Sequence, residues 1–197
     1  MTRREELSVA PGAGRVFEGQ VRGGLADCAP DGRVRLDAIA RWLQEVGYAD
    51  IDDAALVDDG AWVVRRTRIR VERFPRFDER LPIATFCSGL GRLWAERRTS
   101  VPGCLEAVAL WIQLDHNSGR PLPLGARFLA AYEASAAGRR VKARLRHPAL
   151  PERPHAEGRW VFRRTELDVA QHINNAAYWT VLEEELLAGG GVPRLPV

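Results

Sequence analysis

The spacing of hydrophobic residues changes from a helical period to a strand period about 60 residues into the chain. After Val34 the apolar residues recur every three or four positions, as on one buried face of a helix. These residues are Leu36, Ile39, Ala40, Leu43 and Val46. Between Trp62 and Arg73 apolar residues alternate with arginines, which is typical of a strand with one buried and one wet side. The pattern predicts a long helix within Val34–Leu56, followed by a sheet.

Further strands are expected on both sides of this helix. One short strand, Val16–Val21, precedes it, and three more follow Trp62–Arg73. The three are Leu81–Ser88, Leu93–Val101 and Leu105–Asp115, separated by glycines and prolines. One strand, a long helix and four strands make an α+β arrangement with an antiparallel sheet. This order is that of a hot-dog fold, in which the sheet wraps around the central helix.

The same order of elements begins again near the C-terminus. A short helix is expected at Leu124–Ala134, and the segment after it is rich in arginine and proline, which indicates a linker. A predicted strand at Arg159–Glu166, a turn and a helix then repeat the order of Val16–Leu56. We therefore expect an N-terminal hot-dog over residues 1–135, a basic linker over 136–157, and the start of a second, C-terminally truncated hot-dog over 158–197.

The expected second sheet is incomplete. Only nine residues follow Ala188, whereas the missing strands need about 5–6 residues each. We expect the chain to be a piece of a longer protein; the alternative is that a partner chain supplies the missing surface.

Composition narrows the classes of function. The net charge is +3, a single lysine stands among many arginines, and no nucleic-acid motif accompanies them. No apolar run reaches the roughly 20 residues that span a bilayer, and the charged N-terminus is unlike a signal peptide. Three cysteines at no ligand spacing argue against a disulfide framework or a zinc site. We expect a cytoplasmic protein with no nucleic-acid or membrane partner, no metal and no cofactor, and leave a homo-oligomer open.

Candidate chemistry gathers where the last predicted strand meets the last helix. Asp168 and His172 lie four residues apart at this turn, so that the carboxylate can orient the imidazole or position a water molecule. The N–H groups at a helix N-terminus stabilise developing negative charge. Asn174 and Asn175 are favoured residues for capping and supporting that terminus. The face formed by Tyr178, Val181 and Leu182 is interpreted as core and not as a substrate contact.

This junction resembles the second half of the acyl-ACP thioesterases of the FatA/FatB type, which carry Asp-x-Asn-x-His, a hydrophobic residue, Asn-Asn and a Tyr on the next turn. The first half is similar to the N-terminal hot-dog of that family in FPRFDERLPIATFCSGLGRLWAERRTSV and WIQLDHNSGRPLPL. The matching positions are Pro75 and Asp78, Thr85, Cys87 and Gly89, Arg97 and Arg98, and Trp111 and Asp115.

The resemblance implies a tandem hot-dog hydrolase that releases a fatty acid from its acyl carrier protein thioester in fatty acid biosynthesis, with Asp168 and His172 at family catalytic positions. Two departures from the family stand against this. Ala170 replaces the family Asn, and an acidic residue expected on a later strand is missing, because Glu183, Glu184 and Glu185 fall within the helix. A non-catalytic acyl or carrier-protein binding module and an acyl-CoA thioesterase therefore remain alternatives.

Overall fold

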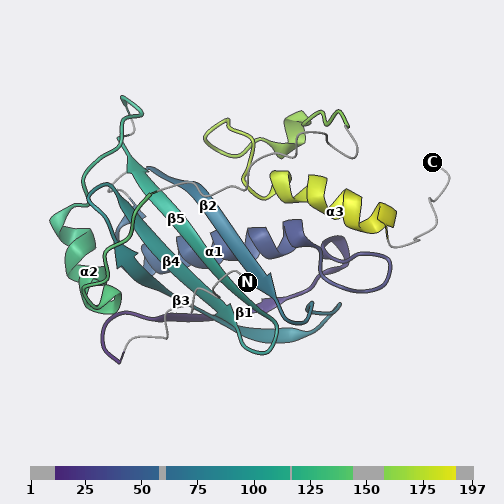
Figure 1. Cartoon of the computed structure of the whole chain (residues 1–197), viewed down its shortest axis with the longest axis horizontal. Coiled ribbons are helices and arrows are strands. Elements are labelled where there is room, and N and C mark those ends of the chain that lie inside the picture. The colour runs from purple at the N-terminus through teal and green to yellow at the C-terminus, as the bar shows by residue number, and fades with distance from the viewer. Residues whose placement is uncertain (1–11, 58–60, 116, 144–157, 190–197) are drawn as a thin grey trace, which may run out of the picture. The chain divides into compact units, whose positions relative to one another are not determined.

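The computed structural model describes residues 12–57, 61–115, 117–143 and 158–189 (Figure 1). The chain divides into two compact units. The first comprises Met1–Arg22, Leu43–Phe74 and Arg80–Ala143. The second comprises Gly23–Trp42, Pro75–Glu79 and Arg144–Val197. Within the described residues, no helix is both long and apolar enough to cross a bilayer.

An antiparallel five-stranded sheet forms most of the first unit. Its strands lie in the order β1-β3-β4-β5-β2. They are β1 (Phe17–Arg22), β2 (Ala61–Val71), β3 (Arg80–Leu90), β4 (Trp94–Val101) and β5 (Leu105–Leu114). Helix α1 (Leu36–Asp53) connects β1 to β2, and α2 (Ala126–Ala136) packs against β3. This arrangement confirms the predicted α+β hot-dog, with the long helix and all five strands within a few residues of their expected bounds.

Strand β2 follows the predicted alternation only in its second half. Ile69 is half-buried and its neighbours Arg68 and Arg70 are exposed, as a strand with one wet side requires. A bulge between Val64 and Arg66 shifts the register against β5. Arg66, which follows the bulge, shares a side with Arg68 and Arg70, but it is half-buried there and pairs with Glu96 of β4.

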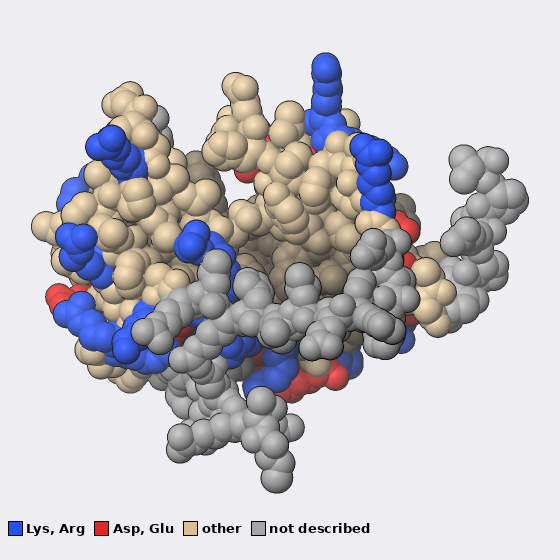
Figure 2. All heavy atoms as spheres, turned by 45° about the horizontal axis from the view of Figure 1, so that its top comes forward, with Lys and Arg blue, Asp and Glu red and all other residues tan. Residues whose placement is uncertain are grey.

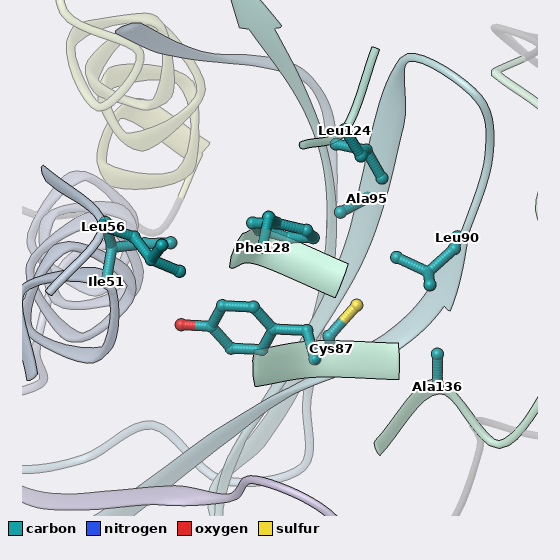
Figure 3. Close-up of a cluster of buried hydrophobic side chains, with 9 residues drawn as sticks. Ile51, Leu56, Cys87, Leu90, Ala95, Leu124, Phe128 and Ala136 are labelled. Atoms are coloured by element: carbon teal, nitrogen blue, oxygen red, sulfur yellow. The ribbon is translucent and has the colours of Figure 1, made fainter. Parts of the chain in front are cut away.

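The apolar core of the first unit lies between the C-terminal part of α1, strands β3 and β4, and α2 (Figure 3). Phe128 of α2 packs against the rings of Trp62 and Tyr132, with ring centroids 5.0 and 4.7 Å away. Burial raises the pKa of the Cys87 thiol to about 11, so this cysteine behaves as a small hydrophobic residue. All three cysteines are free, as expected, although Cys28 is only half-buried.

A buried ionic cluster joins α1 to the sheet. Asp50 of α1 has no exposed surface, and its carboxylate accepts hydrogen bonds from Arg97 of β4 and from Arg15, both at 2.5 Å. The Tyr132 hydroxyl donates to the Asp50 carbonyl at 3.2 Å. Burial, opposed by the nearby Arg97 charge, raises the pKa of Tyr132 to about 12. The charged groups therefore satisfy one another inside the unit.

The described part of the second unit contains two short 3-10 helices and two α-helical segments. They are η1 (Leu25–Asp27), the first two turns of α1, η3 (Arg164–Glu166) and α3 (Ala177–Gly189). The prediction of a strand at Arg159–Glu166 was wrong, since the segment is extended without a ladder and then turns into η3. A strand requires a hydrogen-bonded neighbour, and no described strand pairs with this segment.

The expected basic linker is described only at its beginning, since residues 144–157 lie outside the described residues. The main chain at Arg139 and Arg140 is hydrogen-bonded to the end of the sheet. Leu90 at the end of β3 donates to the Arg139 carbonyl at 3.0 Å and accepts from the Val141 N–H at 3.0 Å.

Candidate active site at the junction before α3

The predicted residues lie on a tight hairpin between η3 and α3. The main-chain N–H of Asp168 donates to the His172 carbonyl at 2.8 Å, and Gln171 donates to the Asp168 carbonyl at 2.9 Å. Gln171 closes the hairpin in the left-handed region, with φ of 61°. The structure thus brings Asp168 and His172 opposite each other across one turn.

The Asp168 carboxylate is held by the main chain of this hairpin. Its Oδ1 atom accepts the N–H of Ala170 at 2.9 Å and the N–H of His172 at 3.1 Å. The carboxylate is half-buried, whereas His172 is exposed. The observed contact therefore runs from the Asp168 carboxylate to the His172 main chain. This places the Asp168 carboxylate at the main chain of His172, whose side chain is exposed.

Asn174 organises the entry into α3. Its side-chain Oδ1 accepts the N–H of Ala176 at 2.8 Å, and its carbonyl accepts the N–H of Ala177 at 2.9 Å. Short side-chain acceptors of this kind satisfy the N–H groups that have no partner within a helix. Asn175 is half-buried beside it. The predicted pair thus lies immediately before the N-terminus of α3.

The same junction is built once more at the start of α1, 139 residues earlier. There Ala29 donates to the Arg33 carbonyl at 2.8 Å and Gly32 donates to the Ala29 carbonyl at 2.9 Å, with Gly32 at φ of 81°. These bonds match those of Asp168, His172 and Gln171 one for one. The internal parallel inferred from the order of elements therefore extends to individual main-chain hydrogen bonds.

The hydrogen bonds that flank the two hairpins also correspond when the residue numbers are shifted by the same 139 positions. Arg35 donates to the Asp27 carbonyl at 2.8 Å, and Asn174 donates to the Glu166 carbonyl at 2.8 Å. Each hairpin also carries a single bridge at its base, Cys28 with Val34 and Leu167 with Ile173. In this register Arg33 is the counterpart of His172.

Charged side chains around the first junction differ from those around the second. Asp37 accepts hydrogen bonds from Arg35 at 2.9 Å and Arg41 at 2.8 Å. Burial by itself would raise the pKa of Asp37, but the bonds from the two arginines outweigh it and lower this pKa. Arg41 also bonds Asp27 at 2.6 Å. The counterparts of Asp37 and Arg41 in the second junction are Ala176 and Thr180, which cannot form such a cluster.

The three consecutive glutamates of α3 differ in burial, a distinction that the sequence pattern did not reveal. Glu184 and Glu185 are exposed, but Glu183 is only 2% exposed. Its Oε2 atom accepts the main-chain N–H of Leu36 at 2.9 Å, and its Oε1 atom lies 2.6 Å from the Arg33 guanidinium. The only sequence signal for this role was a carboxylate among the apolar residues of the helix.

The interpretation of Tyr178 and Leu182 as core was wrong. These residues are 53% and 52% exposed on α3, although the Tyr178 ring packs against that of Phe162, with ring centroids 4.8 Å apart. Their counterparts on α1, Ile39 and Leu43, are buried. A helical period identifies an apolar face, but its burial depends on a second surface.

The described residues contain no group of three or more His, Cys, Asp or Glu side chains that could hold a metal ion. Figure 2 shows basic side chains at several places on the visible face, with acidic side chains among them. The arrangement at the second junction is thus a carboxylate, an exposed imidazole and a helix N-terminus.

Comparison with known proteins identifies the family. The family model described as the acyl-ACP thioesterase N-terminal domain matches residues 16–132, more than half of the chain. The chain belongs to the acyl-ACP thioesterase family. It is thereby placed among thioester hydrolases.

Solved acyl-ACP thioesterases share the fold. The enzyme from Bacteroides thetaiotaomicron superposes with a TM-score of 0.70 at 18% identity, covering 86% of this chain and 73% of that one. The 12:0-ACP thioesterase from Umbellularia californica superposes with a TM-score of 0.64 at 18% identity, covering 88% and 76%. A protein of Mycobacterium tuberculosis is 28% identical over 183 residues, which are 89% of this chain and 72% of that protein.

The acyl-ACP thioesterase positions of the first unit have structural roles. Thr85 bonds the Thr99 hydroxyl across β3 and β4 at 3.0 Å, Cys87 lies in the core, and Arg97 pairs with Asp50. The family match ends at residue 132, before the junction that carries Asp168. The catalytic assignment of Asp168 and His172 therefore stays a prediction.

Proposed function

We propose that this chain hydrolyses an acyl thioester carried by an acyl carrier protein and releases the fatty acid for lipid biosynthesis. The observation that carries the proposal is the hairpin before α3. In a chain of the acyl-ACP thioesterase family, it places Asp168 and the exposed His172 at a helix N-terminus.

The proposed chemistry uses three groups of the second junction. His172 accepts a proton from the attacking water molecule, because its side chain is exposed and its main chain is held by the Asp168 carboxylate. Asp168, held by two main-chain N–H groups, stabilises the imidazolium that forms. The N–H groups at the start of α3 that Asn174 does not occupy stabilise the oxyanion of the tetrahedral intermediate. Collapse of this intermediate breaks the carbon–sulfur bond, and the thiol of the carrier leaves with a proton.

Position 170 can accommodate the amide that the family carries there. Its counterpart in the first junction is Asp31, whose Oδ1 atom accepts the Arg33 N–H at 3.0 Å without disturbing the hairpin. An Asn at position 170 therefore fits the same turn. We propose that Ala170 lowers the rate because a methyl group cannot hold water or a carbonyl oxygen.

The carrier protein is proposed as partner because the charges of this chain favour an acidic one. The chain carries 29 basic and 26 acidic residues, and all but one of the basic residues are arginines. Arginine binds phosphate and carboxylate groups through two parallel hydrogen bonds. A carrier with an acidic surface and a phosphate-linked arm would be attracted by such a surface.

The test compares hydrolysis of acyl carrier protein thioesters with that of the matching acyl-CoA by the wild-type chain, His172→Ala, Ala170→Asn and the control Gln171→Gly. The control changes an exposed neighbour at φ of 61°, a conformation that glycine adopts readily. We expect His172→Ala to lower kcat by about 10²–10⁴-fold, as for loss of a general base. Ala170→Asn should raise kcat, and the control should leave it unchanged.

Equal rates for His172→Ala and the wild type, with folding verified by circular dichroism, would contradict the enzymatic proposal. Tight binding of acyl carrier protein without hydrolysis would then support the binding module, which Ala170 already favours. A higher kcat/KM for acyl-CoA than for the carrier thioester would instead support an acyl-CoA thioesterase.

A further inference from the structure

Glu183 is a buried anion at the N-terminus of a helix to which it does not belong. Its carboxylate lies on α3, accepts the N–H of Leu36, the first residue of α1, and pairs with Arg33 of the hairpin before α1. The Arg33 side chain is itself largely buried, at 14% exposed. Two features that each attract anions, a helix N-terminus and a guanidinium, therefore converge on one carboxylate.

Removal of a carboxylate from water is costly unless charge and hydrogen bonds compensate for it. Glu184 and Glu185, the next residues of the same helix, remain exposed. Burial is therefore specific to the one glutamate that reaches Arg33 and Leu36. The first junction binds a carboxylate through a charged side chain and a main-chain donor, and the occupant belongs to the chain itself.

The internal repeat relates this site to the proposed catalytic junction. In the common register Arg33 corresponds to His172, and the Leu36 N–H corresponds to the Asn175 N–H. We propose that the first junction is a carboxylate-binding site, the counterpart of the junction before α3, and that Glu183 is its resident ligand. Removal of the Glu183 side chain opens this site to a small carboxylate such as acetate.

The experiment measures thermal unfolding of Glu183→Ala in acetate, against chloride at the same ionic strength. The controls are the wild-type chain and Glu184→Ala, which removes a carboxylate from the adjacent exposed position. We expect Glu183→Ala to have a lower Tm than Glu184→Ala, and we expect acetate to raise its Tm with saturation. The Tm of the wild type and of Glu184→Ala should show no response to acetate beyond that to chloride. An equal acetate response of the two variants would overturn the proposal.

A second measurement serves if Glu183→Ala does not fold. The midpoints of urea unfolding are compared for Glu183→Gln, Arg33→Gln and the double variant. Glutamine keeps a carbonyl that can accept the Leu36 N–H but loses the charge that pairs with Arg33. We expect Glu183→Gln to lower the midpoint much less when Arg33 has already been replaced. Additive losses would show that the pair does not form the site. Neither measurement involves hydrolysis, so either result leaves the proposed activity to its own test.

Discussion

Neutralising Asp50 should expose how much the first unit depends on its buried ionic cluster. The Asp50 carboxylate has no exposed surface and lies 2.5 Å from Arg97, whose side chain is 10% exposed. Asp50→Asn keeps the shape of the side chain but removes its charge. The Arg97 guanidinium is then left in the interior without a counter-charge, and the second arginine, Arg15, loses one of its two carboxylate partners.

The expected loss follows from the burial of both partners. Removing one member of a buried ion pair costs about 3–5 kcal/mol, because the remaining charge is desolvated and uncompensated. For a chain of 197 residues, each kcal/mol lowers Tm by about 2–4 °C. Asp50→Asn should therefore lower Tm by about 6–20 °C.

Asp53→Asn is the matched control, one turn further along α1. Asp53 pairs with the same Arg15 but its side chain is 60% exposed, and exposed pairs contribute little to stability. Calorimetry of both variants and of Asp50→Leu/Arg97→Met gives the comparison. The double variant should lose less stability than Asp50→Asn, because it leaves no buried charge. A difference in Tm below about 2 °C corresponds to less than about 1 kcal/mol. If the Tm values of Asp50→Asn and Asp53→Asn differ by less than this, the argument from desolvation fails.

Two further predictions concern the first junction. Asp37 has a lowered pKa in the folded state, so its stabilising effect is complete above the pKa of the unfolded chain and is lost as the pH falls through the folded pKa. Asp37→Asn should therefore lower the free energy of unfolding at neutral pH and flatten the loss of stability below about pH 4. Urea unfolding at a series of pH values measures both effects. An unchanged loss of stability in acid would contradict the role given to Asp37. Gly23→Ala should destabilise the chain, because the new Cβ atom would lie 2.8 Å from Val34 Cγ2. Gly125→Ala, where nothing lies within 4 Å of the added atom, is its control, and equal Tm values for the two would refute the packing argument.

The spacing of apolar residues along the sequence predicts the helix and the strands of the first unit. Apolar residues at a helical spacing in Leu36–Val46 and at a strand spacing in β2 identify the type of element and its apolar face. The resemblance to the family also identified the turn at Pro75 and Asp78 and the arginines Arg97 and Arg98 of β4. The position of the hairpin before α3 could also be predicted. Asp168 and Asn174 are residue types that favour turns and helix N-termini, and His172 lies between them.

The tertiary structure decided which predicted strands found a neighbouring strand and which apolar faces were buried. The predicted strand at Arg159–Glu166 and the apolar face of Tyr178 and Leu182 both require a second surface, and local sequence carries no record of whether one is present. Glu183 shows the converse. Its neighbours in the sequence have the same chemistry, and only the approach of α3 to the Arg33 hairpin selects one of three glutamates for burial.

The sequence by itself therefore determined the fold class, the helix and the strands of the first unit, because each depends on interactions within a short stretch of chain or on burial of one face. The bulge between Val64 and Arg66, the equivalence of the two junctions and the carboxylate bound at the start of α1 were decided only by the tertiary structure. The bulge and the bound carboxylate arise from groups far apart in the sequence, Glu183 and Leu36 being 147 residues apart. Pairing over such separations depends on how the whole chain closes, and local periodicity does not encode it.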